Sequence, residues 1–113
     1  MIAKRYRLTE KQVKKVLHKW KPFFSREIVL NKFKNDYNYN RFAVVISWKS
    51  VKSAVERNFF RRRFYDFCRE KILFNPWNDL VFVVKQKTKL DKNDENCLNF
   101  FLRDLEYLMK KMD

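Results

Sequence analysis

Apolar residues recur at helical spacing between residues 10 and 20, near the start of the chain. Residues three or four positions apart share one face of a helix, so this spacing predicts an amphipathic helix. Thr9 and Gln12 match a capping box at its start, and the helix should end before Pro22. The apolar face consists of Val13, Val16, Leu17 and Trp20.

A second helical pattern begins at Ser53, fades near Leu73 and is rich in both phenylalanine and arginine. Ser53 and Glu56 match another capping box, and the turn-forming residues 75–78 stop the helix. Its apolar stripe consists of Phe60, Phe64 and Phe67. The roughly opposite side carries Asn58, Arg61, Arg62, Tyr65 and Arg69. The pattern predicts a helix that buries one face in a core and offers the other to an anionic partner.

A third helical pattern covers about residues 94–111. Its long apolar stripe consists of Leu98, Phe101, Leu105, Leu108 and Met112. Cys97 and Met109 widen the stripe, and filling of a core explains them better than any binding role. We expect this helix to pack on a sheet.

Three stretches rich in β-branched and aromatic residues are predicted to be strands. They cover residues 26–34, 41–48 and 80–84. The last is a continuous apolar run, which is typical of a central strand. Residues 35–40 have the composition of a turn, so we expect the first two strands to pair as an antiparallel hairpin.

The elements follow the order helix, strand, strand, helix, strand, helix. This order predicts an α+β sandwich, and the length predicts a single domain, residues 1–113. The arginine-rich helix and the strands on either side of it could form a βαβ unit, which is right-handed in most proteins.

The composition adds a strong positive charge to this picture. Lys and Arg number 27 against 13 Asp and Glu, which leaves a formal net charge of +14. Hydrophobic residues make up 46% of the chain, so disorder does not explain the charge. A folded, aromatic-rich domain with this charge favours nucleic-acid binding, with a membrane surface as second choice. We find neither a membrane-spanning run nor a signal-peptide pattern and expect a cytoplasmic protein.

Four arginines crowd the start and middle of the second helical pattern: Arg57, Arg61, Arg62 and Arg63. An arginine-rich helix face is most often simply solvated surface. Here, however, Arg61 has no acidic residue three or four positions away, and Arg62 has only Asp66. A polyanion would relieve the repulsion, and a guanidinium group suits bidentate contact with phosphate. The cluster therefore indicates an RNA- or DNA-binding surface.

Residues that could break a covalent bond are scarce. His18 is the only histidine, and the only cysteines, Cys68 and Cys97, lie outside any metal-type spacing and are predicted to be buried free thiols. Glycine is absent, which excludes a glycine-rich phosphate loop and leaves the turns to asparagine. We find no acid–base or metal site, which makes a free-standing nuclease a remote interpretation.

Several motifs match one known family. They lie at residues 7–8, 26–30 and 41–62. Within the last, Arg57-Asn58 and Arg61-Arg62 match four positions of an Arg-Asn-Arg-x-Lys-Arg signature, and Lys49 matches a lysine of the loop that precedes it. On these residues the chain resembles the protein subunit of bacterial ribonuclease P over nearly its whole length.

The chain departs from the family pattern at several positions. Phe59 stands at the third signature position, which is normally arginine, and Arg63 could offset that loss. Tyr65 replaces a further arginine, and Trp48 replaces the first loop lysine.

The resemblance implies a mixed sheet of about four strands, with a short extra strand near Phe23 and Phe24 and an unusual left-handed βαβ crossover. It implies that this chain is the protein subunit of an endoribonuclease. In that enzyme an RNA subunit performs the chemistry and holds most of the Mg²⁺. The implied partners are ribonuclease P RNA and the 5′ leader of precursor tRNA, with a monomeric protein and no membrane. The main alternative is a structural RNA-binding module, such as a ribosomal protein of similar fold.

The implied site residues form two groups. The RNA-binding group consists of Lys49, Arg57, Asn58, Arg61 and Arg62, assisted by Arg63, Tyr65 and Arg69. The cleft for the leader would be lined by Val13, Leu17, Asn31 and Phe33. The first three stand where the family has aromatic residues. Phe33 lies on the same strand face as Asn31, so it could supply the missing ring.

Overall fold

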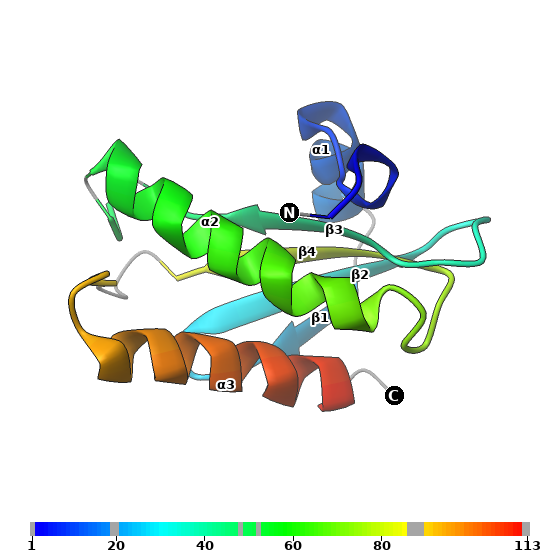
Figure 1. Cartoon of the computed structure of the whole chain (residues 1–113). Helices are drawn as coiled ribbons and strands as arrows, with labels where there is room; N and C mark the ends of the chain where they lie inside the picture. Colours follow the sequence, from blue (N-terminus) through cyan, green and yellow to red (C-terminus); the bar gives the residue numbers. More distant parts are fainter. Residues whose placement is uncertain (1, 19–20, 48, 52, 86–89, 112–113) are drawn as a thin grey trace.

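The computed structural model describes residues 2–18, 21–47, 49–51, 53–85 and 90–111. Within them, the β-strands form one four-stranded sheet, and α-helices pack on both of its faces (Figure 1). The helices are α1 (Glu10–His18), α2 (Ala54–Cys68) and α3 (Glu95–Lys111). The strands are β1 (Lys21–Phe24), β2 (Ile28–Lys34), β3 (Arg41–Val45) and β4 (Asn78–Val84). Short 3₁₀ turns cover Lys4–Tyr6 and Arg69–Lys71. The predicted α+β class and the extra strand near Phe23 and Phe24 are confirmed.

The sheet has the order β1-β2-β4-β3. Strands β1, β2 and β4 pair antiparallel, and β3 pairs parallel with β4. The expected hairpin between residues 26–34 and 41–48 is therefore wrong, because β4 lies between these two strands. Nearly every residue of β4 is buried, and a strand covered on both faces is best placed at the centre of a sheet. Strand β2 begins two residues later than expected, at Ile28, and β3 ends three residues earlier, at Val45. Strand β4 begins two residues earlier than expected, at Asn78.

The connection β3–α2–β4 is a βαβ crossover. In Figure 1, β3 and β4 run in the same direction, α2 lies in front of the sheet, and β4 lies below β3. This arrangement is left-handed, as the family resemblance implies and against the general rule for parallel strands.

Both predicted N-terminal caps are present, and the one at Thr9 and Gln12 is a reciprocal capping box. The Ser53 side chain accepts a hydrogen bond from the Glu56 backbone N–H, and Thr9 and Gln12 cap each other reciprocally. The second helix ends earlier than expected, at Cys68, and continues as a 3₁₀ turn. The final helix begins one residue later than expected, at Glu95.

The main core lies between one face of the sheet and the helices α2 and α3, which lie next to each other in Figure 1. Its largest fully buried side chains include Phe42, Phe60, Phe64, Phe82, Leu80, Leu105 and Leu108. Cys68 is buried here as a free thiol, as predicted, and burial raises its pKa well above the ordinary value. Cys97 is only half-buried, so the full burial predicted for it is wrong, and its Sγ accepts a hydrogen bond from the Asp91 N–H at 3.3 Å. Met112 lies outside the described residues.

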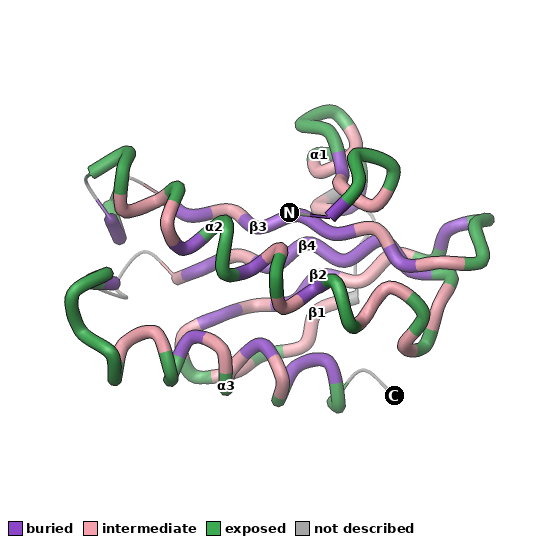
Figure 2. The backbone as a smooth tube through the Cα atoms, in the orientation of Figure 1, coloured by how far each residue is buried: buried purple, intermediate pink, exposed green. Residues whose placement is uncertain are grey.

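The opposite face of the sheet carries a smaller cluster. Leu8, Val16, Ala43 and Val81 are its buried members. Helix α1 packs against β2 and β4 there. Partly buried apolar side chains of α1, β2, β3 and β4 complete the cluster. Figure 2 shows the buried stretches of β3 and β4 in purple. One face is thus closed by two helices, while the other is covered by a single short one.

A buried ion pair joins the two parallel strands at their start. Asp79 accepts hydrogen bonds from Arg41 Nε at 2.8 Å and Nη2 at 2.6 Å, and from Asn35 Nδ2 at 2.8 Å. The Arg41 and Asp79 side chains are only 13% and 7% exposed. This bidentate contact raises the pKa of the Arg41 guanidinium against the opposing effect of burial.

Replacing Asp79→Ala should destabilise the fold by about 3–5 kcal/mol, because it leaves a buried guanidinium without its acceptor. The measurement is urea unfolding followed by circular dichroism. The control is Asp66→Ala, whose pair with Arg69 at 3.6 Å has both side chains at least half exposed. That change should cost less than about 1 kcal/mol. Equal losses in the two variants would contradict the structural role assigned to Asp79.

Candidate nucleic-acid interface

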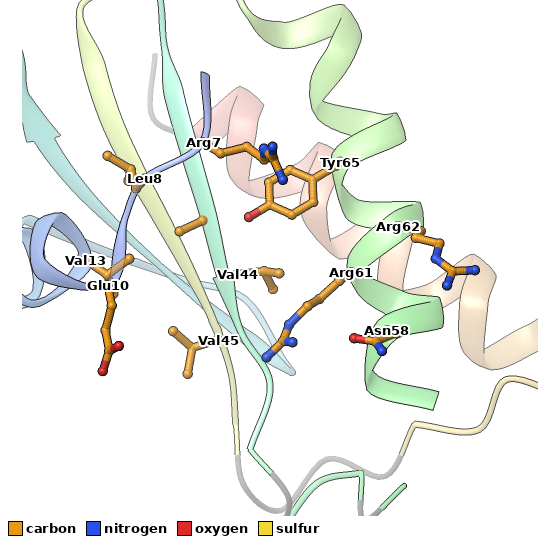
Figure 3. Close-up of a pocket in the computed structure, with 11 residues that line it drawn as sticks. Arg7, Leu8, Glu10, Val13, Val44, Val45, Asn58, Arg61, Arg62 and Tyr65 are labelled. Atoms are coloured by element: carbon orange, nitrogen blue, oxygen red, sulfur yellow. The ribbon is translucent and has the colours of Figure 1, made fainter. Parts of the chain in front are cut away.

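A groove of about 640 Å³ separates the outer side of α2 from the N-terminal segment and α1. Edge strand β3 forms its floor. Figure 3 shows the lining residues, which are Arg7, Leu8, Glu10, Val13, Ala43, Val44, Val45, Asn58, Arg61, Arg62 and Tyr65. Leu8 anchors the N-terminal wall, because its backbone N–H donates to the Phe42 carbonyl at 2.8 Å. The groove therefore joins residues more than fifty positions apart in the chain.

Arg61 and Arg62 are the exposed cations of the α2 wall. Neither has an acidic partner within ion-pairing distance in the part of the chain that the structure describes. Arg61 extends from α2 toward β3, whereas Arg62 extends to the other side of the helix in Figure 3. Their charges are therefore not neutralised internally, which is the property that an anion-binding surface requires.

Tyr65 lies on the same wall and is half-buried. Burial raises the pKa of its hydroxyl, and the positive charges of Arg7 and Arg61 partly oppose that shift. The two arginines therefore approach Tyr65 from opposite sides of the groove, as Figure 3 shows. A neutral tyrosine between two cations offers a ring for stacking and a hydroxyl that can donate or accept a hydrogen bond.

The other predicted RNA-binding residues lie outside the groove lining. Arg57 Nη1 donates to the Val51 carbonyl at 2.7 Å, and Lys49 is exposed in the loop before α2. The guanidinium carbon of Arg63 lies 5.2 Å from the centre of the Phe59 ring, and Arg69 forms an ion pair with Asp66. The sequence-based set is therefore split: Asn58, Arg61, Arg62 and Tyr65 line the groove, and the remaining four do not.

The predicted leader-binding residues lie on the α1 side of the sheet. Val13, Leu17 and Phe33 pack, partly buried, against the smaller apolar cluster. Asn31 is buried, and its Nδ2 donates to the Val81 carbonyl at 3.5 Å. Lys15 Nζ lies 5.8 Å from the centre of the Phe33 ring. The structure thus brings these four residues to one face, and Val13 also lines the groove.

Sequence reasoning assigned no site role to Arg7, Glu10 and Val45, which also line the groove. Arg7 reaches it because a single parallel bridge joins it to Phe42 of β3. The only sequence signal was the Arg7-Leu8 pair that stands before the first helix in the family pattern.

Metal-binding groups and membrane-spanning helices were also sought among the described residues. Among the described residues, no three His, Cys, Asp or Glu side chains come together as a metal-binding group. None of the described helices combines the length and the apolar character needed to cross a membrane.

A basic α+β protein with an arginine-lined groove belongs among nucleic-acid-binding proteins by its geometry. The family model described as Ribonuclease P matches residues 2–113. The chain therefore belongs to the ribonuclease P protein family, which is the protein component of a ribonucleoprotein endoribonuclease. The resemblance found in the sequence is confirmed.

Solved structures show the same fold. A Staphylococcus aureus RNase P protein, described as a mutant with defective mRNA degradation activity, has a TM-score of 0.79 at 19% identity, with 96% of this chain and 89% of that chain covered. The Thermotoga maritima RNase P protein has a TM-score of 0.74 at 19% identity, with 95% and 97% covered. A comparison with curated proteins finds no match. At this level of identity, the structural matches establish the fold alone.

Proposed function

We propose that this protein acts in the cytoplasm as the subunit that binds the catalytic RNA of ribonuclease P and the 5′ leader of precursor tRNA, and so promotes maturation of the tRNA 5′ end. The observation that carries the proposal is the arginine pair on α2. Arg61 and Arg62 are exposed, lack acidic partners among the described residues, and share one groove with Asn58 and Tyr65.

The groove supports contact with folded RNA. Arginine forks match two phosphate oxygens at once, and Asn58 and Tyr65 add hydrogen-bonding groups between them. Lys49, Arg57, Arg63 and Arg69 would extend the contact on either side, in keeping with the net charge of +14. In this proposal the RNA holds the Mg²⁺ ions that promote phosphodiester hydrolysis. The protein neutralises phosphate repulsion and positions the substrate, which makes productive Mg²⁺ binding by the RNA more favourable.

The α1 side of the sheet supports contact with the leader. Val13 and Leu17 form an apolar wall on α1, and Phe33 supplies a ring on β2. Asn31 retains amide groups beside them, although its Nδ2 already donates to β4. A single-stranded segment can stack bases on such a surface without sequence readout. Since leader sequences differ from one precursor to another, sequence-tolerant contact is the kind that this role requires.

The function is tested by reconstitution at low Mg²⁺. Purified protein is added to a cognate ribonuclease P RNA, and correct cleavage of precursor tRNA is measured. We expect the protein to restore cleavage that the RNA alone performs poorly, because added positive charge replaces part of the Mg²⁺ requirement. Binding without stimulation would favour a structural RNA-binding module instead, and cleavage by the protein alone would favour a free-standing nuclease.

Replacing Arg61→Ala together with Arg62→Ala should weaken binding to ribonuclease P RNA and reduce the salt dependence of binding. Each lost phosphate contact removes about 0.7–0.9 from the slope of log affinity against log salt, so the pair should remove about 1.5. Titrations at several salt concentrations measure this. The matched control is Arg103→Ala with Lys110→Ala, which removes the same charge from exposed positions on α3. A slope that falls equally in both variants would mean that only overall charge matters.

Replacing Phe33→Ala should weaken binding of precursor tRNA but not of mature tRNA, because only the precursor carries a leader to stack. The expected loss is about 1–3 kcal/mol. Affinities of the assembled ribonucleoprotein for both tRNAs measure it, with thermal unfolding as a check on the fold. The control is Phe100→Ala, an exposed phenylalanine on α3. The same loss on mature tRNA would reject the leader cleft.

A further inference from the structure

A row of partly exposed side chains crosses all four strands of the sheet at one end. The strand register places Phe24 of β1 opposite Val29 of β2, Val29 opposite Val83 of β4, and Val83 opposite Val45 of β3. Together these four residues form the open row. With strands roughly 4.8 Å apart, the open row spans about 14 Å.

The open row lies on the same face as Phe33. Alternate residues of a strand point to opposite faces, and the sequence neighbours Phe23, Ile28, Leu30, Val44, Phe82 and Val84 all face the main core. The next row along the sheet, formed by Pro22, Asn31, Val81 and Ala43, lies in the region that α1 covers. The valines of the open row are partly exposed, and the Phe24 ring is 53% exposed.

Two phenylalanines point to this face from the described strand residues. Phe33 is the partly buried one, beside α1, and Phe24 is the exposed one, at the far edge of the sheet. The family's aromatic positions for the leader are occupied here by Val13, Leu17 and Asn31. Both rings on this face come from strands, and Phe24 lies outside the cluster against which α1 packs.

The surroundings of Phe24 are basic. Lys111 Nζ donates to the Phe24 carbonyl at 3.1 Å, and Lys85 Nζ donates to the carbonyls of Ser25 and Arg26 at 3.0 and 3.1 Å. Carbonyl groups are neutral, so none of these hydrogen bonds pairs a lysine with an acidic group. The acidic groups nearby are Glu27, 3.9 Å from Arg26, and Asp104, which accepts from Ser25. An exposed ring beside an excess of positive charge matches the way proteins hold single-stranded nucleic acid.

The open row is continuous with the groove. Val45, its last member, also lines the groove together with Asn58 and Arg61. A single strand that reaches the groove at Val45 can therefore continue along the sheet face toward Phe24.

We propose that Phe24 is a base-stacking residue at the distal end of the leader path, and that the open row carries the leader nucleotides farthest from the cleavage site to it. This inference rests on the proposed function, because it assumes that the leader binds the α1 side of the sheet. It adds a second contact, which only precursors with long leaders can reach.

The test uses the protein assembled with a cognate ribonuclease P RNA and compares precursors with short and long leaders and mature tRNA. Replacing Phe24→Ala should weaken binding of the long-leader precursor roughly 5- to 150-fold, the range expected for loss of one stacked base. Short-leader precursor and mature tRNA should bind unchanged. Phe24→Leu should behave like Phe24→Ala, and Phe24→Trp should restore binding, because an apolar side chain without a ring cannot stack. Phe100→Ala, an exposed phenylalanine on α3, is the matched control and should change nothing.

Unchanged long-leader affinity in Phe24→Ala would overturn the proposal, and so would an equal loss on all three RNAs. Sedimentation of the free protein tests whether a second copy of the chain occupies this edge instead. A dimer that dissociates on Phe24→Ala would assign the edge to that second copy. Phe33→Ala distinguishes failure of the distal contact from failure of leader binding on this face. If Phe33→Ala discriminates precursor from mature tRNA while Phe24→Ala is silent, only the distal contact is wrong. If neither discriminates, leader binding on this face is wrong.

Discussion

One buried asparagine holds the crossover together. Asn40 Nδ2 donates to the carbonyls of Lys71 and Phe74 at 3.0 and 2.6 Å, and Asn40 Oδ1 accepts from the Asn78 N–H at 3.2 Å. The Asn40 N–H donates to the Ile72 carbonyl. A fully buried side chain thus fixes the end of the α2 segment relative to the starts of β3 and β4. Because buried polar groups are costly unless satisfied, this network admits few alternative arrangements.

The absence of glycine makes this constraint necessary. The turn between α2 and β4 needs positive φ angles, which Asn75 (46°) and Trp77 (79°) supply. Asparagine tolerates that region, but tryptophan does so only when its surroundings enforce it. The Trp77 carbonyl accepts from the Asn35 N–H at 2.7 Å, and Asn78 Nδ2 donates to the Asn75 carbonyl at 2.8 Å. Asparagine amides therefore secure a turn that glycine would form without help.

Local patterns predicted what local physics decides. The helices followed from apolar spacing and capping residues, and β4 followed from its continuous apolar run. Pairing of strands did not follow, because proximity in sequence favours a hairpin between β2 and β3, whereas burial of β4 on both faces decides the order of the sheet. The arginine cluster was visible in the sequence. Which arginines share a groove depends on the approach of the N-terminal segment to β3, and no local pattern encodes that contact.

Burial of Cys68 has a chemical consequence of its own. Its thiol lies in the centre of the main core, and its raised pKa keeps it protonated, so the reactive thiolate is scarce while α2 stays in place. A thiol reagent can modify this sulfur only when α2 separates from the sheet. Burial also raises the pKa of Cys97, but its sulfur is partly accessible, so Cys97 should react faster than Cys68. The rate at which Cys68 is modified therefore measures how often α2, the helix that carries the arginines, separates from the sheet.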